Sequence, residues 1–334
     1  MVVPKHNSMG AGKGGANMRR ISWKQGLFTG LKTTWLLGKV IFPITFIVTV
    51  LSYTPILQKI VDFVAPVMRL LGLPGEAALP LVLGNFLNLY AGIAGILSLE
   101  MTVKEVFIIA VMLSFSHNLL IESGVATSVG VKLWVVLTVR LGLAVISAIL
   151  INLLWSGGGE IAKYGFVQIQ TKQVDGMWEI ALLAIEKAAF GVLQLAMFVI
   201  PIMLLVQIMK DLNWMDIMSA KMGPFTRALG MNENTSFTLL TGLTVGLAYG
   251  AGVMIQAVKE NGVSRKDATL AIIFLVACHA VVEDTLIFIP LGIPVLPLLL
   301  IRVIVAILLT MVIGRLWNRA EAAKRKETQT TYGH

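Results

Sequence analysis

Two short polar stretches carry the residue types in this chain that are best suited to chemistry. The first is SFSHNLLIES, residues 114–123, and the second is CHAVVEDT, residues 278–285. Each places a histidine five residues before a carboxylate: His117 before Glu122, and His279 before Asp284. At the centre of a bilayer an ionisable group costs at least about 2.5 to 3.5 kcal/mol, so matched sets in an apolar setting indicate function. Because histidine titrates near neutrality, they predict a proton relay or hydrogen-bonding contacts to a ligand.

The composition places these stretches in a membrane. The 334 residues are 57% hydrophobic and 13% charged, with a mean hydropathy of +0.83, whereas soluble domains are roughly 25% charged. A water-soluble fold is therefore excluded. Runs such as residues 133–154 and 295–312 approach the roughly 20 residues that cross a bilayer core. Since they lack the alternation of barrel strands, the sequence predicts an all-α polytopic membrane protein.

The histidines also admit structural roles, because Glu122 ends an apolar run and His279 could bond a neighbouring carbonyl. Metal binding is disfavoured by a mismatch between the two stretches. His279 and Glu283 lie four residues apart on one helical face, but Ile121 takes the matching place after His117. We therefore expect no metal and no cofactor. No set of nucleophile, base and orienting group is evident, so we expect no enzyme.

The chain contains an internal repeat. Five residues, Pro43, Pro66, Arg69, Gly72 and Gly84, recur 158 positions later as Pro201, Pro224, Arg227, Gly230 and Gly242. The offset then becomes 162, at which Lys104, Glu105, His117, Glu122 and Arg140 recur as Lys266, Asp267, His279, Asp284 and Arg302. Chance does not give this order, so the chain holds two copies of one membrane-embedded unit.

Each copy predicts the same five elements: an apolar helix, an amphipathic interfacial helix, a glycine-interrupted segment, an apolar helix ending in polar residues, and a long apolar helix. In copy one they are residues 33–52, 56–71, 76–99, 104–122 and 131–155; in copy two they are 182–209, 213–229, 235–258, 266–284 and 294–316. We divide the chain into a disordered basic tail (1–25), a first repeat (26–155), a connector (156–178), a second repeat (179–316) and a basic tail (317–334).

The glycine-interrupted element decides the topology. It is either one crossing or a re-entrant hairpin with its tip at residues 84–92 and 242–252. Lys and Arg accumulate in cytoplasmic loops, and the re-entrant alternative gives the stronger asymmetry of charge. We therefore predict two inverted repeats, each with three transmembrane helices, an interfacial helix and a re-entrant helical hairpin. The expected location is the bacterial cytoplasmic (inner) membrane, with both termini cytoplasmic.

The two hairpin tips combine hydrogen-bonding groups with glycines that let a ligand approach the backbone. Irregular backbone at membrane depth lines a cavity or packs inside protein, although small residues also serve close helix packing. The substrate-contacting residues that we predict are Asn85, Asn88, Tyr90, Ser116, His117, Asn118, Thr241, Thr244, Tyr249 and His279.

The coupling group that we predict consists of His117, Glu122, His279, Glu283 and Asp284. Two arginines, Arg140 and Arg302, each lie inside a long apolar helix. They either extend to the membrane surface or neutralise the carboxylates of Glu122 and Asp284.

Three motifs resemble the Gate, or nucleoside-recognition, domain. They are LGLPGE at residues 71–76, the glycine-bounded tip, and a helix that opens with MTVKE at 101–105 and reaches SHN at 116–118. That domain occurs in concentrative nucleoside transporters, ferrous-iron transport protein B, and spore maturation proteins A and B. The resemblance covers nearly all of residues 33–316, as two Gate units.

The resemblance implies inverted repeats in which hairpin tips and the unwound middles of neighbouring helices hold the substrate. By position these parts are residues 84–92 with 116–122, and 242–252 with 278–284. The Gln-Thr-Glu tip of the nucleoside transporters is replaced by Asn85 to Asn88 in copy one and by Leu-Thr-Val at 243–245 in copy two. The absence of a GTPase domain and of tip cysteines argues against an iron channel of the ferrous type.

These observations predict a secondary transporter of a small polar solute, nucleoside-like solutes included, that works by alternating access. The alternative is a non-transporting membrane recognition or assembly protein of the spore-maturation type. The partners expected are a small-molecule solute, membrane lipids and a coupling ion, either a proton or sodium. A homo-oligomer is an open alternative, and no nucleic acid is expected.

Overall fold

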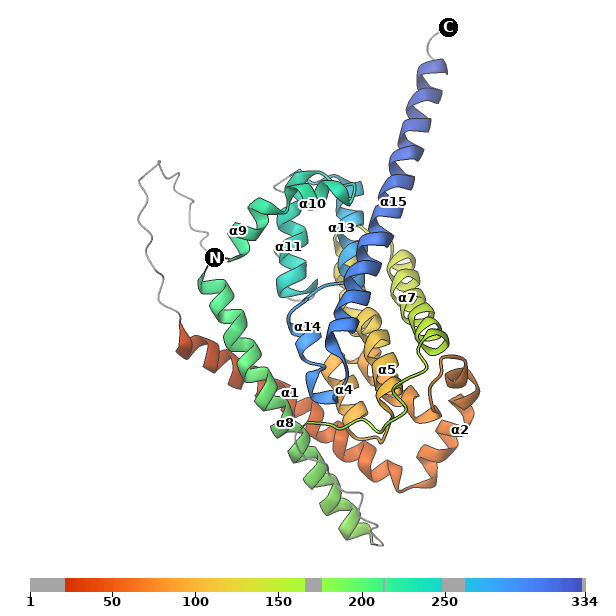
Figure 1. Cartoon of the computed structure of the whole chain (residues 1–334), viewed down its shortest axis with the longest axis vertical. Coiled ribbons are helices and arrows are strands. Elements are labelled where there is room, and N and C mark those ends of the chain that lie inside the picture. The colour runs from red at the N-terminus through yellow and green to blue at the C-terminus, as the bar shows by residue number, and fades with distance from the viewer. Residues whose placement is uncertain (1–21, 166–175, 213, 248–261, 332–334) are drawn as a thin grey trace.

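The computed structural model describes residues 22–165, 176–212, 214–247 and 262–331 (Figure 1). Within these residues the chain is helical, with an isolated β-bridge between Thr102 and Ile161. Most of the predicted N-terminal tail and the predicted contact Tyr249 lie outside the described residues. The all-α class that the sequence predicts is confirmed.

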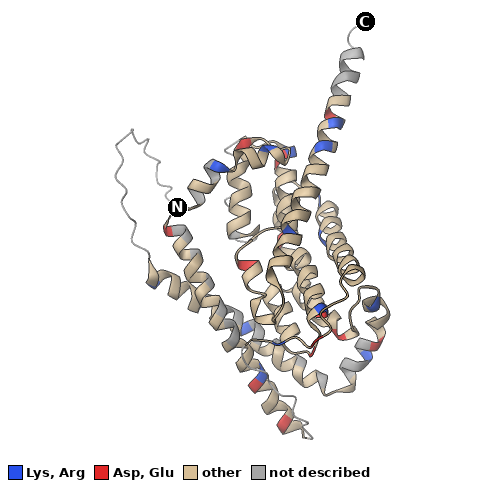
Figure 2. Cartoon of the chain, viewed as in Figure 1, with Lys and Arg blue, Asp and Glu red and all other residues tan. Residues whose placement is uncertain are grey.

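Three described helical stretches are long and apolar enough to cross a membrane, namely Val103–Ser128, Leu133–Leu154 and Val295–Ala323. A fourth candidate is the bent pair Asp62–Leu70 and Gly75–Phe86, whose halves meet at 88° as in a broken span or a re-entrant loop. Figure 2 shows charged residues toward the far ends of helices such as α8 and α15, with much of the bundle's middle uncharged. The chain is a membrane protein by these criteria.

Helices α1 (Trp23–Ser52) and α8 (Met177–Asp211) open the two repeats and cross each other (Figure 1). The two helices pack closely at Gly30, where an added Cβ would lie only 3.1 Å from the Ile200 Cα atom. Both helices begin earlier than residues 33 and 182, where the sequence placed them. The additional turns include the mixed basic and aromatic residues that precede residue 33.

The glycine-interrupted segment of copy one is a helical hairpin, as predicted. After α2 (Pro55–Leu70) and η1 (Gly75–Ala77), α3 (Ala78–Phe86) ends at a break, and α4 (Leu89–Leu97) turns back. The two arms pack through glycine, since a Cβ added to Gly92 would lie 3.1 Å from the Gly84 Cα atom. In copy two the elements that match α2, η1 and α3 are α9 (Trp214–Lys221), α10 (Gly223–Ala228), η2 (Glu233–Thr235) and α11 (Ser236–Val245). Most of the predicted second tip and its return arm lie outside the described residues.

The segments 104–122 and 266–284 are not the single helices that their apolar runs suggested. Copy one has α5 (Val103–Ser116), α6 (Leu119–Ser128) and α7 (Leu133–Leu154). Copy two has α13 (Arg265–Ala277), α14 (Glu283–Leu286), η3 (Ile289–Leu291) and α15 (Val295–Thr331). Each broken helix is interrupted at its histidine, as the family resemblance implied. The last helix continues past residue 316, where the sequence placed the start of a tail.

The two broken helices approach each other from opposite ends of the bundle. In Figure 1, α5 lies in the lower half and α13 in the upper half, yet the rings of His117 and His279 lie 5.2 Å apart. Both histidines follow the C-terminal ends of their helices. Opposed directions for equivalent helices are what inverted copies require.

The described first part of the connector, residues 156–165, contacts both repeats. Its backbone accepts hydrogen bonds from the start of α5, with Lys104 N donating to Gly158 O at 2.8 Å. Farther along, Gly165 N donates to Pro290 O at 2.7 Å. Burial raises the pKa of the Tyr164 phenol between these contacts. This segment therefore ties the first repeat to the turn before α15.

Candidate functional site

The site begins with two equivalent backbone breaks. Asn118 and Ala280, each the residue after the histidine, have φ angles of 52° and 41°. Their positions differ by the repeat offset of 162 (280 − 118). A left-handed conformation costs an L-residue roughly 1 kcal/mol, and Ala, unlike Asn, has no polar side chain that eases it. Strain of this kind persists where the surrounding structure holds it in place.

Each break is held by an earlier helix of its own repeat, α3 in the first and α11 in the second. Asn118 N donates to Gly84 O at 2.8 Å, and in the second repeat Ala280 N donates to Gly242 O at 3.1 Å. Glycine lets these positions pack closely, because an added Cβ at Gly84 or Gly242 would lie 2.4 Å from a methyl of Leu113 or Leu275 and displace that leucine. These two glycine carbonyls thereby satisfy backbone amides that the broken helices leave unpaired.

Arg140, from α7, closes the first half of the site. Its side chain is fully buried. Its Nε donates to Phe115 O at 2.9 Å, and its Nη2 contacts both His117 O and the Glu122 Oε2 atom. The guanidinium thus supplies donors to the carbonyls at the end of α5 and neutralises the nearby carboxylate.

Arg302, from α15, closes the second half of the site, and its side chain is also fully buried. Its Nη2 donates to His279 O at 2.8 Å and lies 3.3 Å from Asp284 Oδ2. The structure therefore places both predicted charge partners beside their predicted carboxylates rather than at the membrane surface.

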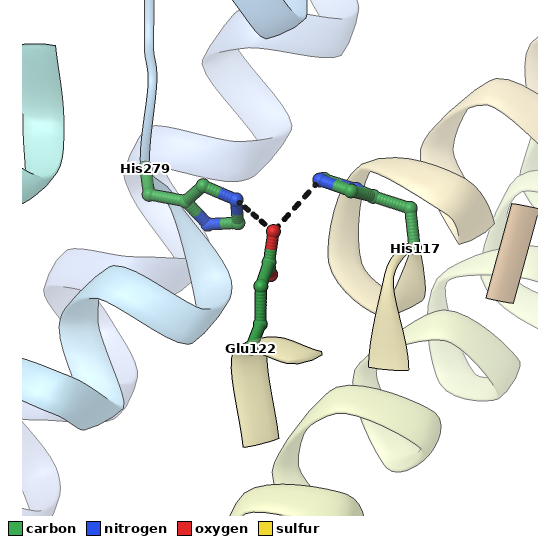
Figure 3. Close-up of side chains that lie close together, drawn as sticks. All are labelled: His117, Glu122 and His279. Carbon is green, nitrogen blue, oxygen red and sulfur yellow. Dashed lines mark ion pairs between the residues drawn. The ribbon is translucent and has the colours of Figure 1, made fainter. Parts of the chain in front are cut away.

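The two halves meet at the histidines (Figure 3). His117 and His279 point from opposite sides at one oxygen of Glu122, with Nε2 to Oε1 distances of 3.4 and 3.2 Å. The Asp284 Oδ2 atom lies 3.9 Å from His117 Nε2 and 3.5 Å from His279 Nε2. All four side chains are buried. We refer to His117, Glu122, His279 and Asp284 as the central cluster.

A hairpin residue reaches the other repeat near this cluster. Tyr90, in α4, donates its hydroxyl hydrogen to Glu283 Oε1 at 2.5 Å. Glu283 begins α14, one residue before Asp284. Both residues were predicted site residues, and the structure brings them together across the repeats.

The remaining predicted contacts bond mainly to their own backbone. Asn88 caps α4 by accepting from Ala91 N at 2.9 Å. The side chains of Asn85, Ser116, Thr241 and Thr244 each donate to a carbonyl four residues earlier. These bonds satisfy polar groups inside α3, α5 and α11 and at the start of α4. Their role as solute contacts stays a prediction.

Sequence reasoning missed the pairing across the repeats. The sequence pattern paired His117 with Glu122 and His279 with Asp284, each within its own repeat. In the structure, Glu122 contacts both histidines. The search for metal ligands likewise considered each repeat alone. The constant offset of 162 was the available signal, because pseudo-symmetric copies place equivalent residues around a shared axis.

Comparison with known proteins agrees with this architecture. A family model described as Gate, nucleoside recognition, matches residues 34–132 and 192–305. The chain is 61% identical over 294 residues to a protein of Bacillus subtilis (strain 168) described as uncharacterized membrane protein YvoD. That similarity covers 88% of this chain and 94% of the relative. No solved structure matches.

Proposed function

This chain belongs to the Gate, or nucleoside-recognition, family of membrane proteins, and from that premise we propose that it is a secondary transporter. It carries a small polar solute by alternating access and couples the movement to a cation, a proton or a metal ion. It performs no catalysis. It resides in the bacterial cytoplasmic membrane with both termini in the cytoplasm.

The observation that carries the proposal is the central cluster. Four ionisable side chains meet where two broken helices from opposite repeats end, with α3 and α11 bonded to the two breaks. Inverted-repeat transporters hold substrate and ion at such a junction of discontinuous helices. Buried charges at this depth are costly unless they serve a purpose.

The contacts divide into two kinds that suit alternating access. Those within a repeat hold each arginine to its own histidine carbonyl and carboxylate, as in the 2.9 Å ion pair of Arg140 with Glu122. Those between repeats join His279 Nε2 to Glu122 Oε1 at 3.2 Å, His117 Nε2 to Asp284 Oδ2 at 3.9 Å, and the Tyr90 hydroxyl to Glu283 Oε1 at 2.5 Å. Movement of one repeat against the other would separate the second kind and preserve the first. Occupancy of the cluster by a cation would then bias that movement.

Nucleosides are the first solutes to test, because the family model is described by nucleoside recognition. A thermal-shift screen of the purified protein against nucleosides, bases, amino acids and divalent ions would select a ligand. Uptake of that ligand into proteoliposomes then tests transport. When a cation gradient is imposed, wild-type protein should accumulate the ligand inside the vesicles. The double variant His117→Ala/His279→Ala should lose at least about 90% of the uptake rate, a tenfold change that corresponds to about 1.4 kcal/mol.

Gly142→Ala is the matched control, since no atom lies within 4 Å of an added Cβ there. It should transport at the wild-type rate. Unchanged uptake in the double histidine variant would refute the coupling role of the cluster. Ligand binding without uptake under any gradient would refute transport and favour a recognition protein.

A further inference from the structure

We propose that His117, Glu122 and His279 bind one divalent transition-metal ion, with Asp284 as an additional oxygen donor. One ligand atom from each of the first three residues lies within 4.8 Å of the others. The ligands come from both repeats, so the ion would join them. The proposal concerns binding; only the ion's role in transport rests on the proposed function.

The hydrogen bonds of the imidazole rings fix which nitrogen faces the cluster. His117 Nδ1 lies 2.6 Å from Leu113 O, and His279 Nδ1 lies 2.8 Å from Leu275 O. A carbonyl can only accept, so both Nδ1 atoms carry hydrogen. When the rings are neutral, their Nε2 lone pairs therefore face the cluster. Metal-bound histidines are usually oriented in this way, with the other ring nitrogen bonded to a carbonyl or carboxylate.

Two Nε2 lone pairs that face a carboxylate oxygen repel it unless a positive charge lies between them. Among the described residues, no hydrogen-bond partner reaches the buried Nε2 of His279. A cation at the centre would satisfy both rings and the Glu122 Oε1 atom together. The exposed fraction of the three side chains is only 3 to 5%, so bulk water does not screen this repulsion.

The distances fit a metal better than direct hydrogen bonds. Metal-to-ligand bonds of about 2.0–2.1 Å at tetrahedral angles separate the ligand atoms by about 3.3–3.4 Å. The observed separations from Glu122 Oε1 to the two Nε2 atoms are 3.4 and 3.2 Å. Asp284 Oδ2, the additional donor, lies 3.5 Å from His279 Nε2 and 3.9 Å from His117 Nε2. Charge-assisted hydrogen bonds between N and O are shorter, at about 2.7–2.9 Å.

The arginines orient the oxygen ligands. Arg140 holds Glu122 Oε2 at 2.9 Å, which leaves Oε1 directed at the histidines. Arg302 shares Asp284 Oδ2 at 3.3 Å and thereby weakens it as a ligand. Two imidazoles with carboxylate oxygen suit Zn²⁺, Fe²⁺, Co²⁺ or Mn²⁺, whereas Mg²⁺ and Ca²⁺ prefer oxygen alone.

The test uses tag-free full-length protein in detergent, stripped with a chelator and measured without any gradient. After loading with Zn²⁺ and desalting, elemental analysis should find one zinc ion per chain. His117→Ala and His279→Ala should each weaken zinc affinity at least about 100-fold, because each removes a ligand. His6→Ala, which alters a histidine far from the cluster in sequence, should bind like the wild type.

The elution volume and the melting temperature of each variant, both measured without metal, check that it is folded. His117→Gln and His279→Gln provide a second pair that keeps an amide donor near the same carbonyl. If no variant folds, titration of the wild-type protein with Co²⁺ decides, because a tetrahedral site gives intense visible bands. Failure to retain zinc, equal binding by the histidine variants, or the absence of such bands would overturn the metal site without bearing on uptake. Loss of uptake with intact zinc binding would contradict only transport.

Discussion

The buried ion pair of Arg140 and Glu122 offers a sharp test of how the site is held together. Arg140→Met keeps most of the side-chain volume but removes the donors to Phe115 O and His117 O and leaves Glu122 buried without its 2.9 Å partner. Breaking a buried pair from one side costs about 3–5 kcal/mol, since the remaining charge is uncompensated. We expect that loss of unfolding free energy in a titration from mild detergent into SDS.

The matched control is the exposed pair of Arg227 and Glu233, whose side chains are 63% and 55% exposed. Arg227→Met should cost less than about 1 kcal/mol, as exposed pairs do. The double variant Arg140→Met/Glu122→Gln should regain part of the loss, because it removes the unpaired charge. The reasoning would be refuted if the unfolding free energy of Arg140→Met lay within about 1 kcal/mol of the wild-type value or equalled that of Arg227→Met.

Three further predictions concern stability and are checked by melting temperature and SDS titration. Gly92→Ala should destabilise the hairpin by about 1–3 kcal/mol, because an added Cβ would lie 3.1 Å from Gly84 Cα and Pro80 O; a neutral result would contradict the close packing. Ala280→Gly should stabilise the protein by about 0.5–1 kcal/mol by relieving its positive φ, and a loss would argue against strain there. Tyr90→Phe should cost about 0.5–1.5 kcal/mol through the lost bond to Glu283, whereas no change would make that bond dispensable.

Much of the architecture could be predicted from the sequence because it depends on composition and repetition. Apolar runs without alternation permit only helices, and the glycines of residues 84–92 marked the hairpin tip. The offset of 162 identified His117 with His279 and Arg140 with Arg302. Features that each repeat possesses by itself were therefore accessible.

The helix breaks were harder to predict from the residues, and only the family resemblance implied them. Neither Asn118 nor Ala280 is a strong helix breaker, and no proline lies beside either one. The breaks depend on tertiary contacts: the carbonyls of Gly84 and Gly242 accept from the freed amides, and buried arginines donate to the freed carbonyls. A single-sequence pattern does not encode such partners.

The composition of the central cluster was inaccessible for a related reason. Pattern matching compares equivalent residues and does not reveal which of them meet across an axis. Glu122 therefore appeared as the partner of His117 alone, and His279 was assigned to Asp284. The sequence likewise did not show that the Asn88 side chain caps α4; its predicted contact with a solute stays a prediction.

The central claim is that the junction of the two repeats opens to each side of the membrane in turn, and Cys278 reports on it directly. It is the only cysteine, is fully buried, and precedes His279. Membrane-impermeant maleimides applied separately to right-side-out and inside-out vesicles measure its access from each side. We predict labelling from both sides, at rates that change at least several-fold when Zn²⁺ or the transported solute is added. Labelling from neither side under any condition, with full reaction after SDS denaturation, would contradict alternating access.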